Sequence, residues 1–228
     1  MPFFFMDYWY IVLVLPMVIL STWAGIKVKT TFQKYSNIFS GLTGAEAAVR
    51  VLNANGVYDV KVERVAGNLT DHFDPRTNVI RLSESVYDSR TVAAVGVAAH
   101  EAGHAVQHAQ SYRPIIIRNR FVPIVNFGSS ISWIVIIAGL FMFNDLLIWL
   151  GIALFGLTTV FHLLTLPVEL NASKRAMQAI RDNNLLFGDE IDGARKVLTA
   201  AAMTYIAALL TSIASLLRLI IIFGRRND

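Results

Sequence analysis

The pentapeptide HEAGH, residues His100–His104, lies near the middle of the chain among small residues. On an α-helix, side chains four positions apart lie on one face, so the imidazoles of His100 and His104 can point at one cation. Glu101 is offset by one position and can hold a water molecule beside that cation. In this H-E-x-x-H pattern two histidines bind zinc and the glutamate is the general base. The segment therefore predicts a helix that carries most of a zinc-hydrolase site.

The composition indicates a membrane protein. Of the 228 residues, 55% are hydrophobic and only 16% are charged, whereas a soluble domain averages about 25% charged residues. The net charge of +4 is expected to set the orientation in the membrane, and no motif points to nucleic acid. The chain has no cysteine, which excludes disulfides and thiolate ligands. A zinc ion would therefore need nitrogen and oxygen ligands.

Long apolar runs define the expected fold class, a mainly α, polytopic membrane protein with a small α+β zinc-peptidase region. A membrane-spanning helix needs about 20 apolar residues, and four stretches reach or approach this length: 8–26, 121–143, 146–166 and 200–223. The first follows Asp7 and precedes Lys27, which favours a retained signal-anchor over a cleaved signal peptide. The sequence leaves open whether the last stretch spans or turns back.

These runs predict five segments along the chain. They are a first transmembrane helix (1–26), a cytosolic-side catalytic region (27–120), a transmembrane hairpin (121–166), a second catalytic segment (167–199) and a C-terminal hydrophobic helix (200–228). The two catalytic segments contain all but three of the 20 Lys and Arg residues, which predicts that both lie on the cytoplasmic face. Arg225 and Arg226 would lie on the other side if the last stretch spans.

Local patterns predict the elements of the catalytic segments. Thr43 and Glu46 form a capping box that opens a helix to about Asn55. Alternating residues predict two strands, 60–65 and 78–82, separated by a polar loop at 67–75. The motif helix is expected over about 90–110, with Asp88 or Ser89 as its cap. Polar helices are expected after Pro167 to about residue 183 and over about 190–198.

A catalytic zinc ion needs a third protein ligand. The candidates are His72, His108, His162, Glu169 and the acidic group Asp189, Glu190 and Asp192. His108 would lie about 12 Å from His100 along the helix, which is too far for one site. A packing role explains His162 equally well. Glu169 is favoured because it stands where the third span meets the inner face, although an ordinary acid near a helix start also explains it.

A family resemblance adds to this interpretation. Three runs, at positions 74–112, 166–176 and 193–210, resemble the bacterial YugP-like membrane zinc metallopeptidases, relatives of the membrane gluzincin peptidases. The resemblance covers nearly the whole chain. It implies one zinc ion per chain bound by His100, His104 and Glu169, with Glu101 as the base. It also implies an integral protein of the bacterial plasma membrane.

One position near the proposed ligands departs from the pattern of the membrane gluzincins. Membrane gluzincins often have an Asp four residues after the ligand glutamate, whereas this chain has Ser173, and Asn171 is expected to share its orienting task. His72, Tyr112 and Arg175 are candidates for stabilising the oxyanion. The edge of strand 78–82 is a candidate for holding an extended substrate.

The function predicted from these observations is a membrane-embedded zinc metalloendopeptidase, which hydrolyses peptide bonds of a peptide or protein substrate by zinc-activated water with a glutamate general base. The lipid bilayer is its expected surrounding. Two alternatives stay open. One is a zinc-binding membrane scaffold or sensor without turnover. The other is a site-2-type intramembrane protease, for which Asp192-Gly193 is a superficial match, although polar residues such as Arg90 and Gln107 bound the motif helix.

Overall fold

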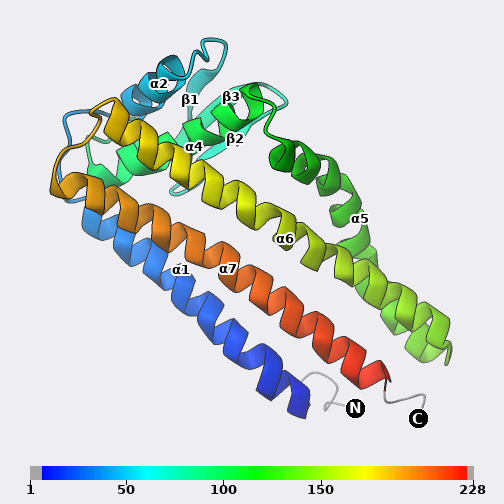
Figure 1. Ribbon diagram of the computed structural model, residues 1–228. Helices are drawn as coiled ribbons and strands as arrows, with labels where there is room; N and C mark the ends of the chain where they lie inside the picture. Colours follow the sequence, from blue (N-terminus) through cyan, green and yellow to red (C-terminus); the bar gives the residue numbers. More distant parts are fainter. Residues whose placement is uncertain (1–6, 225–228) are drawn as a thin grey trace. The chain divides into compact units, whose positions relative to one another are not determined.

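The computed structural model describes residues 7–224 and is mainly α-helical with one small sheet, as predicted (Figure 1). Arg225 and Arg226, and the outer ends of the first and last predicted segments, lie outside the described residues. The chain divides into two compact units. We call Met1–Ala24, Ile116–Pro167 and Thr204–Asp228 the span unit, and Gly25–Ile115 and Val168–Met203 the motif unit.

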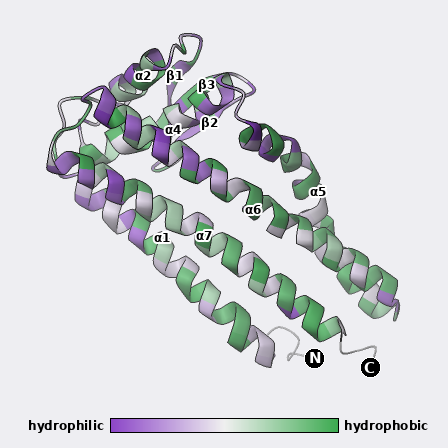
Figure 2. Cartoon of the chain, in the orientation of Figure 1, coloured by the Kyte–Doolittle hydropathy of each residue, from purple (hydrophilic) through white to green (hydrophobic). Residues whose placement is uncertain are grey.

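Four helical stretches are long and apolar enough to cross a membrane. They are Tyr10–Tyr35 (the π-helix η2, Tyr10–Val14, followed by α1, Leu15–Tyr35), α5 (Arg113–Phe141), α6 (Asp145–Asp182) and α7 (Asp189–Gly224). Figure 2 shows hydrophobic residues along much of their length. Only 17% of the most apolar window of α6 is buried by protein, so its apolar side chains need an apolar surrounding. These features fit a membrane protein.

Two helices are longer than the sequence predicted. The third apolar run and the polar helix after it form the single helix α6, which continues through Pro167. Proline is tolerated inside membrane helices because neighbouring groups satisfy the freed backbone carbonyl. The short helix expected over 190–198 and the last apolar stretch likewise form the single helix α7. The last stretch therefore does not turn back within the described residues.

Within the span unit, helices approach closely and one buried charge is paired. A Cβ at Gly151 would lie 2.9 Å from the backbone nitrogen of Ile136, so the two helices that form the hairpin are in backbone contact there. Arg218 is 8% exposed, and its Nε donates to Oδ2 of Asp7 at 2.9 Å. Its guanidinium also lies over the Tyr10 ring, 5.5 Å from the centroid. Charges within apolar helices are expected to be paired in this way.

The motif unit contains helix α2 (Gly44–Ala54) and a three-stranded sheet. The capping box predicted at Thr43 and Glu46 is present. The strands are β1 (Lys61–Val65), β2 (His72–Asp74) and β3 (Val79–Ser83), in the order β1-β3-β2, with β3 parallel to β1 and antiparallel to β2.

Two predictions about this sheet were wrong. The segment 67–75 was expected to be only a loop, but its last residues form β2 by pairing with Val79–Arg81. Strand 78–82 was expected to offer an edge to substrate, but β3 is the central strand and is paired on both sides at Val79–Arg81. The edges of the sheet are β1 and β2.

Helix α4 (Val92–Ala109) carries the HEAGH motif and lies in the core of the motif unit. Its N-cap is Thr91, whose side chain accepts a hydrogen bond from the backbone of Ala94, and not Asp88 or Ser89 as predicted. Glu84–Tyr87 form the short helix α3, and Asp88 is the C-cap of that helix, so Asp88 does not cap the start of α4. Because most of α4 is buried, the motif stands on a well-supported helix.

Candidate metal centre

Two histidines and one glutamate converge within the motif unit. Nε2 of His100 lies 3.2 Å from Oε2 of Glu169, and Nε2 of His104 lies 3.3 Å from the same oxygen. The two histidine rings are nearly perpendicular, with centroids 4.7 Å apart. Each of the three side chains offers one possible ligand atom, and these atoms all lie within 4.8 Å of one another. Among residues 7–224, no other group of three histidine or carboxylate side chains meets this condition.

The close approach of two helices produces this convergence. The histidines are on α4 and Glu169 is on α6. A Cβ at Gly103 would lie 2.8 Å from the carbonyl oxygen of Ala172, so only glycine allows the two backbones this contact. The glycine stands one position before His104, and the alanine stands three positions after Glu169. The side chains that carry the ligand atoms therefore meet beside the point of closest approach.

The arrangement fits a zinc ion. Zn–N and Zn–O bonds of about 2.0–2.2 Å in a tetrahedron place neighbouring ligand atoms about 3.3–3.5 Å apart. The separations of 3.2 and 3.3 Å between the histidine Nε2 atoms and Oε2 of Glu169 are close to this value. Two neutral imidazole nitrogens and one carboxylate leave a fourth position free, as in catalytic zinc sites. The Glu169 side chain is only 4% exposed, and a buried carboxylate of this kind requires a cation or proton beside it.

The second ring nitrogen of each histidine also has a partner. Nδ1 of His100 lies 3.2 Å from Oγ of Ser173, and Nδ1 of His104 lies 3.0 Å from Oε1 of Gln107. Asn171 does not reach either histidine directly and instead accepts a hydrogen bond from Gln107. The sequence interpretation missed Gln107, although its position three residues after His104 places both on one helix face.

Two further acidic side chains belong to the surroundings of the cluster: Glu101 lies next to His100 on α4, and Asp71 interacts electrostatically with Glu101. Glu101 follows His100 on α4 and is 9% exposed. Asp71 accepts hydrogen bonds from the backbone nitrogen of Ser83 at 2.7 Å and from its hydroxyl at 3.0 Å. Burial raises the pKa of Asp71, and the negative charge of Glu101 adds to this, while the bonds from Ser83 oppose it. Sequence analysis did not single out Asp71.

Charge and burial act in opposite directions on His104. Burial favours the neutral imidazole, but the hydrogen bond to Glu169 and the charges of Glu101 and Glu169 outweigh it, so the pKa of His104 is raised. Two carboxylates therefore act electrostatically on the same imidazole.

The other candidates occupy different places. His72 is exposed on β2, with Nδ1 2.8 Å from the carbonyl oxygen of Thr70. The exposed His108 ring lies 5.7 Å from that of Phe73. His162 belongs to the span-unit part of α6. Arg175 lies over the Tyr112 ring and donates to Asn171 and Gln110.

The acidic group at the start of α7 makes local contacts. Glu190 accepts a hydrogen bond from the backbone of Phe187 at 2.9 Å, and Asp192 lies 3.4 Å from Arg195. Gly193 packs against Tyr35 and Val92. The superficial match of Asp192-Gly193 to a site-2-type protease therefore has no counterpart in the histidine cluster.

Comparison with known proteins assigns the chain to a family of zinc metallopeptidases. Residues 10–224 match the family described as "putative neutral zinc metallopeptidase", and the chain belongs to this family. It is 49% identical over 211 residues to the protein named "Putative membrane protease YugP" from Bacillus subtilis (strain 168), covering 92% of this chain and 94% of the relative. The resemblance read from the sequence is thereby confirmed. No solved structure matches the chain.

Proposed function

We propose that this protein is a membrane-embedded zinc metalloendopeptidase with one zinc ion per chain. His100, His104 and Glu169 are the proposed ligands, and Glu101 is the proposed general base. The observation that carries this proposal is the approach of both histidine Nε2 atoms to one oxygen of Glu169, at 3.2 and 3.3 Å, in a chain of the zinc metallopeptidase family.

The chemistry follows from the position of Glu101. Zinc bound at the cluster supplies a Lewis acid and lowers the pKa of a water molecule to about 7. The Glu101 carboxylate, beside His100 on α4, takes a proton from the attacking water. It then delivers that proton to the leaving amine nitrogen as the peptide bond breaks. Asp71 interacts electrostatically with Glu101 and accepts hydrogen bonds from Ser83 at the end of β3.

The strand β2 is the proposed docking strand for substrate, in place of β3. It packs against α4 and forms an edge of the sheet. An extended peptide can add to such an edge through backbone hydrogen bonds. We expect a peptide or protein substrate and no nucleic acid.

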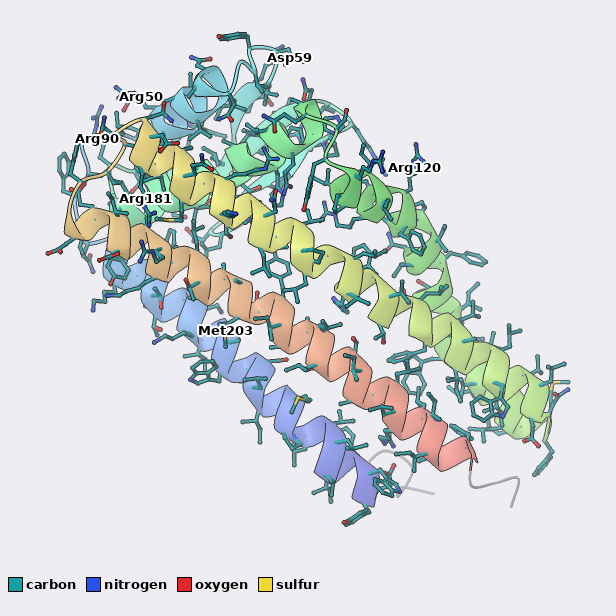
Figure 3. The ribbon with its side chains drawn as sticks, in the orientation of Figure 1. Arg50, Asp59, Arg90, Arg120, Arg181 and Met203 are labelled. Carbon is teal, nitrogen blue, oxygen red and sulfur yellow. The ribbon has the colours of Figure 1, made fainter. Side chains whose placement is uncertain are left out.

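The proposed active site faces the cytoplasm of a bacterium. The motif unit holds 15 of the chain's 20 Lys and Arg residues, and basic segments stay on the cytoplasmic side of a membrane. Several of these side chains are exposed, including Arg50, Arg90 and Arg181, which Figure 3 labels. An Arg50→Cys variant in intact cells, treated with a membrane-impermeant thiol reagent, tests this location. If the cysteine is not labelled, the cytoplasmic location is supported. If the cysteine is labelled, the cytoplasmic location is contradicted.

A Glu101→Gln variant separates a peptidase from a metal-binding scaffold. The full chain in detergent micelles is expected to bind zinc as the wild type does, because Glu101 is not a proposed ligand. Cleavage of an unfolded protein substrate such as casein is expected to disappear. Persistent cleavage in this variant would contradict the proposed mechanism, and absence of zinc binding in the wild type would contradict the site itself.

A further inference from the structure

Gln107 is buried at 0% exposure in the motif unit, and every polar atom of its side chain has a partner. Oε1 faces Nδ1 of His104 at 3.0 Å. Nε2 donates to the carbonyl oxygen of Val168 at 3.0 Å and to Oδ1 of Asn171 at 2.9 Å. A polar side chain buried this completely is stable only when its hydrogen-bonding groups face complementary partners.

The orientation of the Gln107 amide is determined by neighbouring groups that can only accept or only donate a hydrogen bond. The carbonyl oxygen of Val168 can only accept a hydrogen bond, so the Gln107 NH₂ group must face it. Arg175 can only donate, and its Nε lies 2.8 Å from Asn171 Oδ1, so that atom of Asn171 must be the oxygen. An Asn171 oxygen in turn requires the Gln107 NH₂ group opposite it. Both ends of the network give the same orientation.

This orientation has a consequence for His104. The Gln107 atom that faces Nδ1 of His104 must be the carbonyl oxygen, which cannot donate. Nδ1 must therefore carry a hydrogen, and in the neutral ring Nε2 must be the nitrogen with the free lone pair. Nε2 is the atom that lies 3.3 Å from Glu169. The ring is thus held in the tautomer that a metal ligand at this place needs.

We propose that Gln107 is a positioning residue that fixes the tautomer and orientation of His104, and that Val168, Asn171 and Arg175 hold Gln107 in the required orientation. This inference rests on the proposed zinc site. It assigns the task of orienting one histidine to an amide on the motif helix itself, while Ser173 on α6 contacts the other histidine. Partners of this kind contribute about 10–100-fold to metal affinity.

The test uses the full chain in micelles, with zinc affinity measured by competition with a chelator. Gln107→Met keeps the size of the side chain and removes its hydrogen bonds, and we expect zinc affinity to fall about 10–100-fold. The exposed Gln178 on α6 provides the matched control Gln178→Met, which is expected to bind zinc as the wild type does. Wild-type affinity in Gln107→Met would overturn the proposal.

A second readout reports the tautomer directly. In ¹⁵N-histidine-labelled, zinc-loaded wild type, we expect His104 to show a slowly exchanging Nδ1–H and a metal-bound Nε2; in Gln107→Met the Nδ1–H should exchange rapidly with water. A different tautomer in the wild type would overturn the proposal even if the variant fails to fold. Loss of zinc binding in the wild type would instead refute the proposed function, so the two failures are distinguishable.

Discussion

The hydroxyl oxygen of Ser173 lies 3.2 Å from Nδ1 of His100, the ring nitrogen that does not face Glu169. Ser173 stands four residues after Glu169 on α6, so one face of that helix supplies both a proposed ligand and a group that contacts another ligand. A hydroxyl is a weaker hydrogen-bond partner for an imidazole than a carboxylate, since it carries no charge.

Ser173→Ala is therefore expected to lower zinc affinity about 10-fold, because His100 loses the group that holds its ring. Chelator competition measures the change. Ser130→Ala is the control, since the exposed Ser130 hydroxyl bonds only to the Asn126 carbonyl of its own helix. An equal loss of affinity in both variants would show that Ser173 has no specific role.

Glu169→Gln is expected to abolish stoichiometric zinc binding. The amide keeps the size of the side chain but removes the negative charge between the two imidazoles, so the loss of affinity should exceed the roughly 100-fold upper range for an orienting partner. Metal content after dialysis against buffered zinc measures the effect. If the variant retains one zinc ion per chain, Glu169 is not a ligand.

Gly103→Ala is expected to lower both stability and zinc affinity. The new Cβ would lie 2.8 Å from the backbone carbonyl of Ala172, which cannot move without shifting α6. Overpacking of this kind costs about 1–3 kcal/mol, and here it also separates the histidines from Glu169. Thermal unfolding in micelles checks the stability.

Gly25→Ala is the control for this experiment, because a Cβ at Gly25 meets no atom within 4 Å. Alanine there is expected to leave stability unchanged or to raise it by about 0.5–1 kcal/mol, since glycine is the poorer helix former. If Gly103→Ala binds zinc and unfolds as the wild type does, the helix contact is not what positions the ligands.

Asp74 gives the sheet a predicted pH dependence. Hydrogen bonds from Thr77, the backbone of Arg76, and Arg81 lower the pKa of Asp74 to about 2. Because this value is below the unfolded one, the bonds stabilise the fold above pH about 4, and their contribution is lost as the pH falls toward about 2. Asp74→Asn should be less stable than the wild type at pH 6, with the difference shrinking below pH 4. A difference that stays constant over this range would exclude the charge as its cause.

Much of the fold could be predicted because the relevant signals are local. The capping box at Thr43 and Glu46 and the apolar runs depend on residues near one another in sequence. The boundaries failed where tertiary contacts decided them. Pro167 suggested a break that α6 does not have, and residues 72–74 became a strand only because β3 lies beside them. Asp88 was a plausible helix cap, but α3 includes the residues just before it.

The motif histidines could be read from spacing alone, Glu169 was favoured by its place at the end of the third apolar run, and the family resemblance supported that choice. Their roles as ligands remain predictions, although the structure brings the three side chains together. Asp71 and Gln107 were missed for a physical reason. A partly buried aspartate before a strand and a glutamine on a helix have no special sequence signature until their partners, Ser83 and His104, are placed beside them.

The sequence by itself determined that this chain has apolar stretches long enough to span a membrane. It also determined that His100, Glu101 and His104 share one helix at the spacing of the H-E-x-x-H pattern. Both follow from the sequence because helix periodicity and apolar length depend only on residues near one another in the chain. Only the tertiary structure decided which residues complete the cluster and which hold it in place. The contacts between α4 and α6 join positions more than 60 residues apart, and they accompany the backbone approach that Gly103 allows at Ala172.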